Sequence, residues 1–225
     1  MIDVVLDEEE KGLMRKILRA QAYRQMMAAN ILGHGLKYLV DPEGRLGIVQ
    51  DMQHILTQVS RVQALYTTID GGDIRHEAAA RMDRIPYPAT RFELATFLAT
   101  SDAAEELAMK SYVDSKCKIF AAIARDDLQY ERQATKRSQA LFEEFAADVS
   151  QAPLVQQVLR RWLVICLLSL GRPGTAGDRR VQELGLRRLS VAESVTEYLE
   201  RLQPLIEMAG LTPDDLRDAG IELPV

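Results

Sequence analysis

Long stretches of helical periodicity, with no strand pattern between them, constrain this chain most. Apolar residues recur at helical spacing over about residues 8–30, 45–69, 90–111 and 115–149. Short turn sequences such as Asp41-Pro-Glu-Gly and Gly71-Gly72 separate these stretches. Because long helices joined by short turns pack as antiparallel neighbours, the sequence predicts an all-α, antiparallel four-helix bundle.

Capping signals place the starts of two helices. Thr90-x-x-Glu93 and Ser190-x-x-Glu193 both have the capping-box pattern, in which the hydroxyl and the carboxylate satisfy free backbone N–H groups. The second of these helices is expected to run to about Ala209 with Pro204 inside it.

The remaining segments complete a single-domain prediction. We expect a short helix over residues 73–83 and an apolar helix over 153–170. Residues 1–170 are then a ferritin-like helical bundle, and residues 171–225 are a helical C-terminal extension packed on it.

Composition excludes several classes of protein. The 225 residues carry a net charge of −5, which argues against nucleic acid as a partner because phosphate binding needs a clustered cationic face. Two cysteines are too few for a disulfide framework. The N-terminus lacks a signal-peptide pattern, and the apolar run from Trp162 to Leu168 is too short to cross a bilayer. We therefore expect a soluble, cytoplasmic protein.

One face of the second helical stretch is unusually polar. Its members share helical spacing and are Asp51, His54, Gln58, Arg61 and Leu65. A simple core helix would be apolar at these positions, so this stripe predicts a polar interior or an interface.

The C-terminal third carries a family resemblance. The stretch Arg161-Trp-Leu-Val-Ile-Cys-Leu-Leu-Ser-Leu-Gly-Arg-Pro-Gly-Thr, followed by Glu183-Leu-Gly-Leu-Arg, resembles the phenylacetic acid catabolic family. Gln203-Pro-Leu and Ala209-Gly-Leu match later steps of the same pattern. This family includes the A and C subunits of phenylacetyl-CoA epoxidase, so the resemblance implies a ferritin-like fold and an oxygenase context.

The resemblance also implies where iron ligands would stand. The catalytic members carry a Glu on the first helix, Glu-x-x-His on the second and fourth, and an acid on the third. Matching the helices places Gln25, Gln58, Arg61, Asp127 and Tyr130 at the first, second and fourth of these sets. Only Asp127 keeps a carboxylate.

These departures imply that the metal site has been lost. Gln25 and Gln58 keep the shape of glutamate without its charge, and Arg61 is expected to pair with Asp127 in the former metal position. No cofactor is expected, with a di-iron centre as the alternative. The third-helix acid stays open among Glu93, Asp102 and Glu105.

A second set of residues competes for a metal. Asp51-x-x-His54 places an acid and an imidazole on one face of a helix, and with Asp127 it forms the alternative ligand set.

We therefore expect a non-catalytic, ferritin-like subunit of a phenylacetyl-CoA-epoxidase-like multicomponent di-iron oxygenase. It would associate with itself or with a ligand-competent paralogue. The alternatives are an active monooxygenase or hydroxylase with a divergent metal site, and a metal-free bundle that binds a hydrophobic, aromatic or acyl-CoA ligand.

Overall fold

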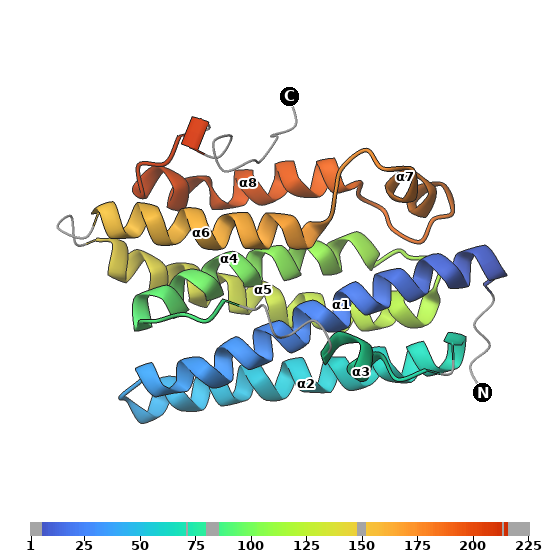
Figure 1. Ribbon diagram of the computed structural model, residues 1–225, viewed down its shortest axis with the longest axis horizontal. Helices are drawn as coiled ribbons and strands as arrows, with labels where there is room; N and C mark the ends of the chain where they lie inside the picture. The colour runs from blue at the N-terminus through green and yellow to red at the C-terminus, as the bar shows by residue number, and fades with distance from the viewer. Residues whose placement is uncertain (1–5, 71, 80–85, 148–151, 213, 216–225) are drawn as a thin grey trace.

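The computed structural model describes residues 6–70, 72–79, 86–147, 152–212 and 214–215. Within these ranges the chain is helical and contains no strand, which confirms the all-α helical bundle (Figure 1). The elements in chain order are α1 (Glu8–Gly35), the 3-10 turn η1 (Leu36–Tyr38), α2 (Pro42–Asp70), α3 (Ile74–Ala79), α4 (Arg91–Tyr112), α5 (Lys118–Ala146), α6 (Ala152–Leu170), α7 (Ala176–Glu183) and α8 (Val191–Met208).

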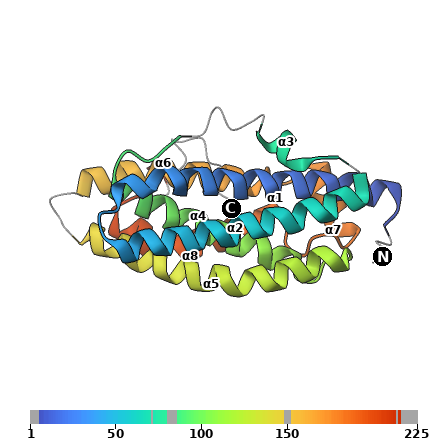
Figure 2. The ribbon, with the colours of Figure 1, turned by 90° about the horizontal axis from the view of Figure 1, so that it is seen from below.

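Two antiparallel helix pairs form the bundle. α1 packs along α2, and α4 packs along α5. The pairs meet where α2 contacts α5 and α1 contacts α4, and Figure 2 shows the first pair from its outer side. α6 and α8 cover the side of α4 that faces away from α1 and α2 (Figure 1). α4 is therefore the central helix, in contact with four of the other long helices.

The capping box predicted at Ser190 is confirmed, and that at Thr90 forms only in its Thr90 half. Thr90 accepts a hydrogen bond from the backbone N–H of Glu93, and Ser190 forms a complete capping box with Glu193. Pro204 lies inside α8, as the sequence predicts. At the other end of that helix Gly210 has φ of +67°, the left-handed conformation that ends a helix readily only at glycine.

Two short helices complete the comparison with the sequence. The helix expected over residues 73–83 is observed as Ile74–Ala79, and its predicted end at residues 80–83 lies outside the described residues. α7 was not predicted. Thr175 caps it by accepting from the N–H of Asp178, and the buried Asp178 carboxylate is held by Arg187 and by the N–H of Val191.

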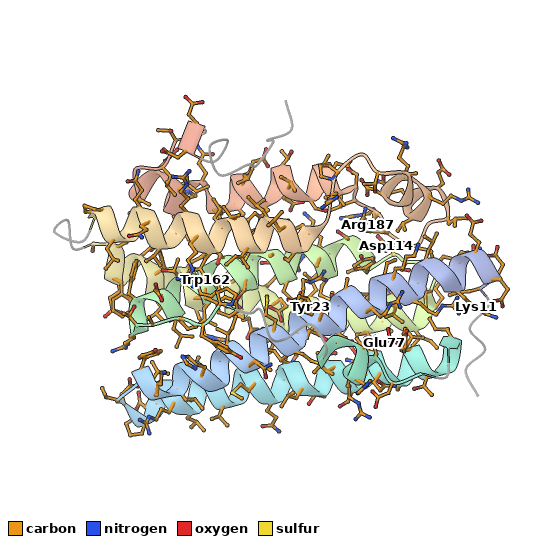
Figure 3. The ribbon with its side chains drawn as sticks, in the orientation of Figure 1. Lys11, Tyr23, Glu77, Asp114, Trp162 and Arg187 are labelled. Atoms are coloured by element: carbon orange, nitrogen blue, oxygen red, sulfur yellow. The ribbon has the colours of Figure 1, made fainter. Side chains whose placement is uncertain are left out.

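The core beneath α6 is aromatic. Trp162, labelled in Figure 3, is fully buried. Its ring meets that of Phe97 on α4 edge to face, with 5.0 Å between the ring centroids. Large aromatic side chains bury much apolar area, and edge-to-face pairs add about 0.5–1.5 kcal/mol beyond that burial. This contact fixes α6 against α4.

α6 is also the one helix in the described residues that is long and apolar enough to span a membrane, over Pro153–Leu170. In the fold it packs on α4 and α8, and its residues Leu159, Leu163 and Cys166 are buried there. One side of α6 is therefore part of the core of the bundle.

We expect Tyr198→Phe to lower the free energy of unfolding by about 0.5–1.5 kcal/mol. The Tyr198 hydroxyl is buried and donates to the carbonyl oxygen of Thr100 over 3.1 Å, which links α8 to α4. Chemical denaturation of both proteins measures the difference. Equal stability would show that this hydrogen bond does not anchor α8.

Candidate metal centre

A small cavity lies inside the bundle, where α1, α2, α4, α5 and α6 meet. Its volume is about 50 Å³. Two carboxylates from α4, Asp102 and Glu105, and two from α5, Asp127 and Glu131, line it. A single water needs about 10–15 Å³ by the same kind of measure, so the cavity has room for an ion with a few waters. It has no room for an acyl-CoA.

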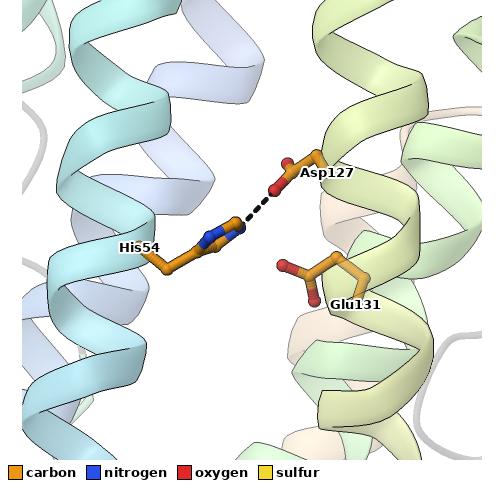
Figure 4. A group of neighbouring side chains, drawn as sticks. All are labelled: His54, Asp127 and Glu131. Atoms are coloured by element: carbon orange, nitrogen blue, oxygen red, sulfur yellow. Dashed lines mark hydrogen bonds and ion pairs between the residues drawn. The ribbon is translucent and has the colours of Figure 1, made fainter.

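Three potential ligands meet at this cavity from two facing helices. His54 comes from α2, while Asp127 and Glu131 come from α5 and share one face because they are four residues apart (Figure 4). His54 Nε2 and Asp127 Oδ1 form a hydrogen bond of 2.6 Å. One ligand atom from each of the three side chains lies within 4.8 Å of the others. Elsewhere in the described chain, no group of three His, Cys, Asp or Glu residues meets this criterion.

Two polar atoms at the cavity are buried without a hydrogen-bond partner. They are Oδ2 of Asp127, whose side chain is 1% exposed, and Oε1 of Gln25, whose residue is 5% exposed. Native proteins satisfy nearly all buried polar atoms, so each such atom needs an explanation. Both are oxygens of the type that coordinates cations.

The acids destabilise one another's charged forms. Burial is the main cause that raises the pKa of Glu131 well above its usual value, and the charges of Asp102 and Asp127 raise it further. Burial also raises the pKa of Asp102 to about 7, against a hydrogen bond from Ser138 that lowers it. No basic side chain in the described residues forms an ion pair with Glu131. The cavity therefore has a deficit of positive charge.

Glu105 is different, because basic and amide groups from α1 hold both its oxygens. Arg24 Nε donates to Oε2 over 3.1 Å, and the Gln21 amide donates to Oε1. Arg24 also donates to Gln21 and to the carbonyl of Ser169. The Arg24 and Glu105 side chains are 14% and 15% exposed. Burial still raises the pKa of Glu105, although Arg24 lowers it.

The structure brings three of the five predicted former ligand positions together. Gln25, Gln58 and Asp127 all line the cavity, from α1, α2 and α5. The polar stripe of the second helix therefore faces the interior at Gln58, which is 4% exposed.

The predicted pair between Arg61 and Asp127 is wrong. Arg61 donates to the exposed Asp126 over 2.8 Å and to Gln58, while Asp127 is bonded to His54. A helix turns about 100° per residue, so a side chain three positions from an inward one lies at the edge of the buried face. Arg61 stands at this edge and reaches toward solvent.

Tyr130 and Asp51 also stand beside the cavity rather than in its ligand group. The Tyr130 ring stacks on the His54 ring with centroids 3.6 Å apart, and its hydroxyl donates to Asp51. Arg137 donates to the same carboxylate over 3.0 Å. Of the alternative set of Asp51, His54 and Asp127, the structure brings only His54 and Asp127 together in one group of potential ligands. Glu131 takes the third place.

Two of the three candidates for the third-helix acid lie at the cavity. Asp102 and Glu105 both line the cavity, whereas Glu93 bonds the backbone at Ala89 and pairs with Arg161 at the start of α4. Sequence reasoning missed Glu131 and Arg24. The signal for Glu131 was its spacing of four from Asp127.

These residues fit one metal ion and do not fit the complete di-iron set. The buried orphan oxygens, one imidazole and several carboxylates form a donor set that suits Fe²⁺ or Mn²⁺. The sequence contains no Glu-x-x-His pair of the kind that holds two irons. The prediction that no metal binds stays a prediction.

No protein-family model matches the chain, and no curated protein matches it significantly.

Proposed function

We propose that this protein is a metal-binding helical bundle whose site takes a divalent transition ion, Fe²⁺ or Mn²⁺, through His54, Asp127 and Glu131. One observation carries the proposal: three ligand atoms from facing helices converge in a buried acid-lined cavity, beside an orphaned Asp127 oxygen. A cation there would neutralise acids that otherwise repel one another.

Each residue would have a defined role. Imidazole binds a metal only when neutral and carboxylates bind it only when ionised, so binding would release protons. The His54 Nε2–Asp127 Oδ1 hydrogen bond would give way to ligation by both atoms. A metal bound there supplies Lewis-acid chemistry, which polarises an oxygen ligand or lowers the pKa of a bound water. The stacked Tyr130 fixes the plane of the imidazole.

The resemblance in the C-terminal third gives this proposal its context. On that basis we propose a cytoplasmic, ferritin-like oxygenase component of the phenylacetic acid catabolic type, which associates with itself or with a paralogous subunit. An aromatic or acyl-CoA substrate would have to bind outside the 50 Å³ cavity.

Metal titration tests the proposal. We expect chelator-treated protein to bind Mn²⁺ or anaerobic Fe²⁺ by calorimetry and elemental analysis, and His54→Ala and Glu131→Gln each to weaken binding more than tenfold. His76→Ala is the matched control, because this exposed histidine also follows an aspartate by three residues but belongs to no ligand group. Equal binding by all variants, or none by the parent protein, would contradict the proposal.

A second candidate is the metal-free partner subunit. It is favoured by Gln25 and Gln58, which present neutral amides to the cavity where charged ligands would stand. The two candidate functions predict different results in the same metal titration. A metal-free subunit would bind no ion as the parent protein and would gain binding in the Gln25→Glu, Gln58→Glu double variant.

A further inference from the structure

The acid cavity already contains a fixed cation at one end. The Arg24 guanidinium lines the cavity and bonds Glu105, and both side chains are about 85% buried. Neither oxygen of Glu105 is free, since Arg24 holds one and Gln21 holds the other. The Arg24 stem comes from α1, which also contributes the orphaned Gln25 oxygen.

Positive charge is thus distributed unevenly over the four acids. Glu105 has a permanent counter-ion, because guanidinium stays protonated at all ordinary pH values. Asp127 has only a hydrogen bond from His54, and its second oxygen is orphaned. Glu131 has no cationic partner among the described residues. The need for a metal ion is therefore concentrated at the His54–Asp127–Glu131 end.

We infer that Arg24 occupies the place of a second cation, so that the cavity holds a single metal ion and Arg24 blocks a latent carboxylate subsite at Asp102 and Glu105. This inference rests on the proposed metal binding at His54, Asp127 and Glu131. A dinuclear carboxylate centre needs acids whose oxygens are free to bind or bridge both ions. With Glu105 held by Arg24 and Gln21, that requirement is met for one ion only.

A site that holds one metal ion supports fewer kinds of chemistry than a site that holds two. Two metal ions together can clamp both oxygens of a reacting group, whereas a single ion acts on one bound oxygen. The site would thus use one ion as a Lewis acid or as a one-electron centre.

The test is metal stoichiometry in the full chain with Mn²⁺ as the probe. We expect about one equivalent in the parent protein and about two in Arg24→Leu, measured by elemental analysis and by electron paramagnetic resonance, which distinguishes an isolated Mn²⁺ from a coupled pair. Arg24→Lys keeps the charge and should stay near one. Arg61→Leu is the matched control, since that arginine pairs with Asp126 outside the cavity, and should also stay near one.

The number of bound metal ions in each protein tests the role of Arg24. Two equivalents in the parent protein, or one in a folded Arg24→Leu, would overturn the role of Arg24. No metal in the parent protein would instead overturn the proposed metal binding itself. If Arg24→Leu does not fold, as circular dichroism would show, Arg24→Met replaces it, because methionine keeps a long unbranched side chain but neither carries a charge nor donates to Glu105. Two equivalents in Arg24→Met then support the inference, and one overturns it.

Discussion

Replacing His54 with alanine in the metal-free protein is expected to lower the free energy of unfolding by about 3–5 kcal/mol. His54 is the hydrogen-bond partner of Asp127, which is 1% exposed and has its other oxygen orphaned already. Without His54, the carboxylate would be buried with no partner on either oxygen. Denaturant unfolding at neutral pH in the presence of chelator measures the loss.

Two further variants test whether the unpartnered Asp127 carboxylate causes the loss of stability in His54→Ala. The double variant His54→Leu, Asp127→Leu removes both polar groups and should be more stable than His54→Ala, because no charge is left buried. Arg61→Ala should change stability by less than about 1 kcal/mol, since its partner Asp126 is 64% exposed. If His54→Ala costs no more than Arg61→Ala, the pair with Asp127 does not stabilise the fold.

The metal-free protein is expected to become less stable as the pH rises from about 4 to about 7. Burial raises the pKa of Asp102 to about 7 and that of Glu131 well above its usual value. In this pH window the folded state therefore binds more protons than the unfolded state, so the free energy of unfolding falls as pH increases. Across this window, the ionisation of one carboxyl shifted to this extent lowers the free energy of unfolding by on the order of 2–4 kcal/mol.

Denaturation curves at a series of pH values test this trend, with Asp102→Asn as the matched variant. The asparagine cannot ionise, so its stability should change less across the same window. The metal-loaded protein should show the opposite slope, because metal binding requires deprotonated ligands. Stability of the metal-free parent that rises with pH through this window would show that the acids are not desolvated.

The long helices could be predicted because their signals are local. Periodicity and capping residues lie within each segment, so α1, α2, α4, α5, α6 and α8 follow from the sequence. α7 could not be predicted in this way. It is eight residues long, and the Asp178 carboxylate near its start is stabilised by Arg187, which lies beyond its end. Only the folded chain brings these two residues together.

Only some residues of the candidate site could be predicted from the sequence. On α5, Tyr130 and Glu131 lie three and four positions after Asp127 and so point about 100° apart, and it is Glu131 that reaches the cavity. Which of them faces inward depends on how α5 is rotated against its neighbours, and tertiary packing sets that rotation. On α2, His54 and Arg61 are seven positions apart and share one face, so rotation does not distinguish them. His54 meets the buried Asp127, whereas Arg61, about two turns further along, meets the exposed Asp126.

The hydrogen bond from Tyr198 to Thr100 has a consequence for how the chain assembles during synthesis. Thr100 immediately precedes Ser101 and Asp102, which line the acid cavity, and its hydroxyl accepts from Cys166, another lining residue. The last long helix is thus tied to α4 directly behind the acids. A nascent chain that ends before Tyr198 lacks this hydrogen bond, so α4 is held from that side only after almost the whole chain has been made.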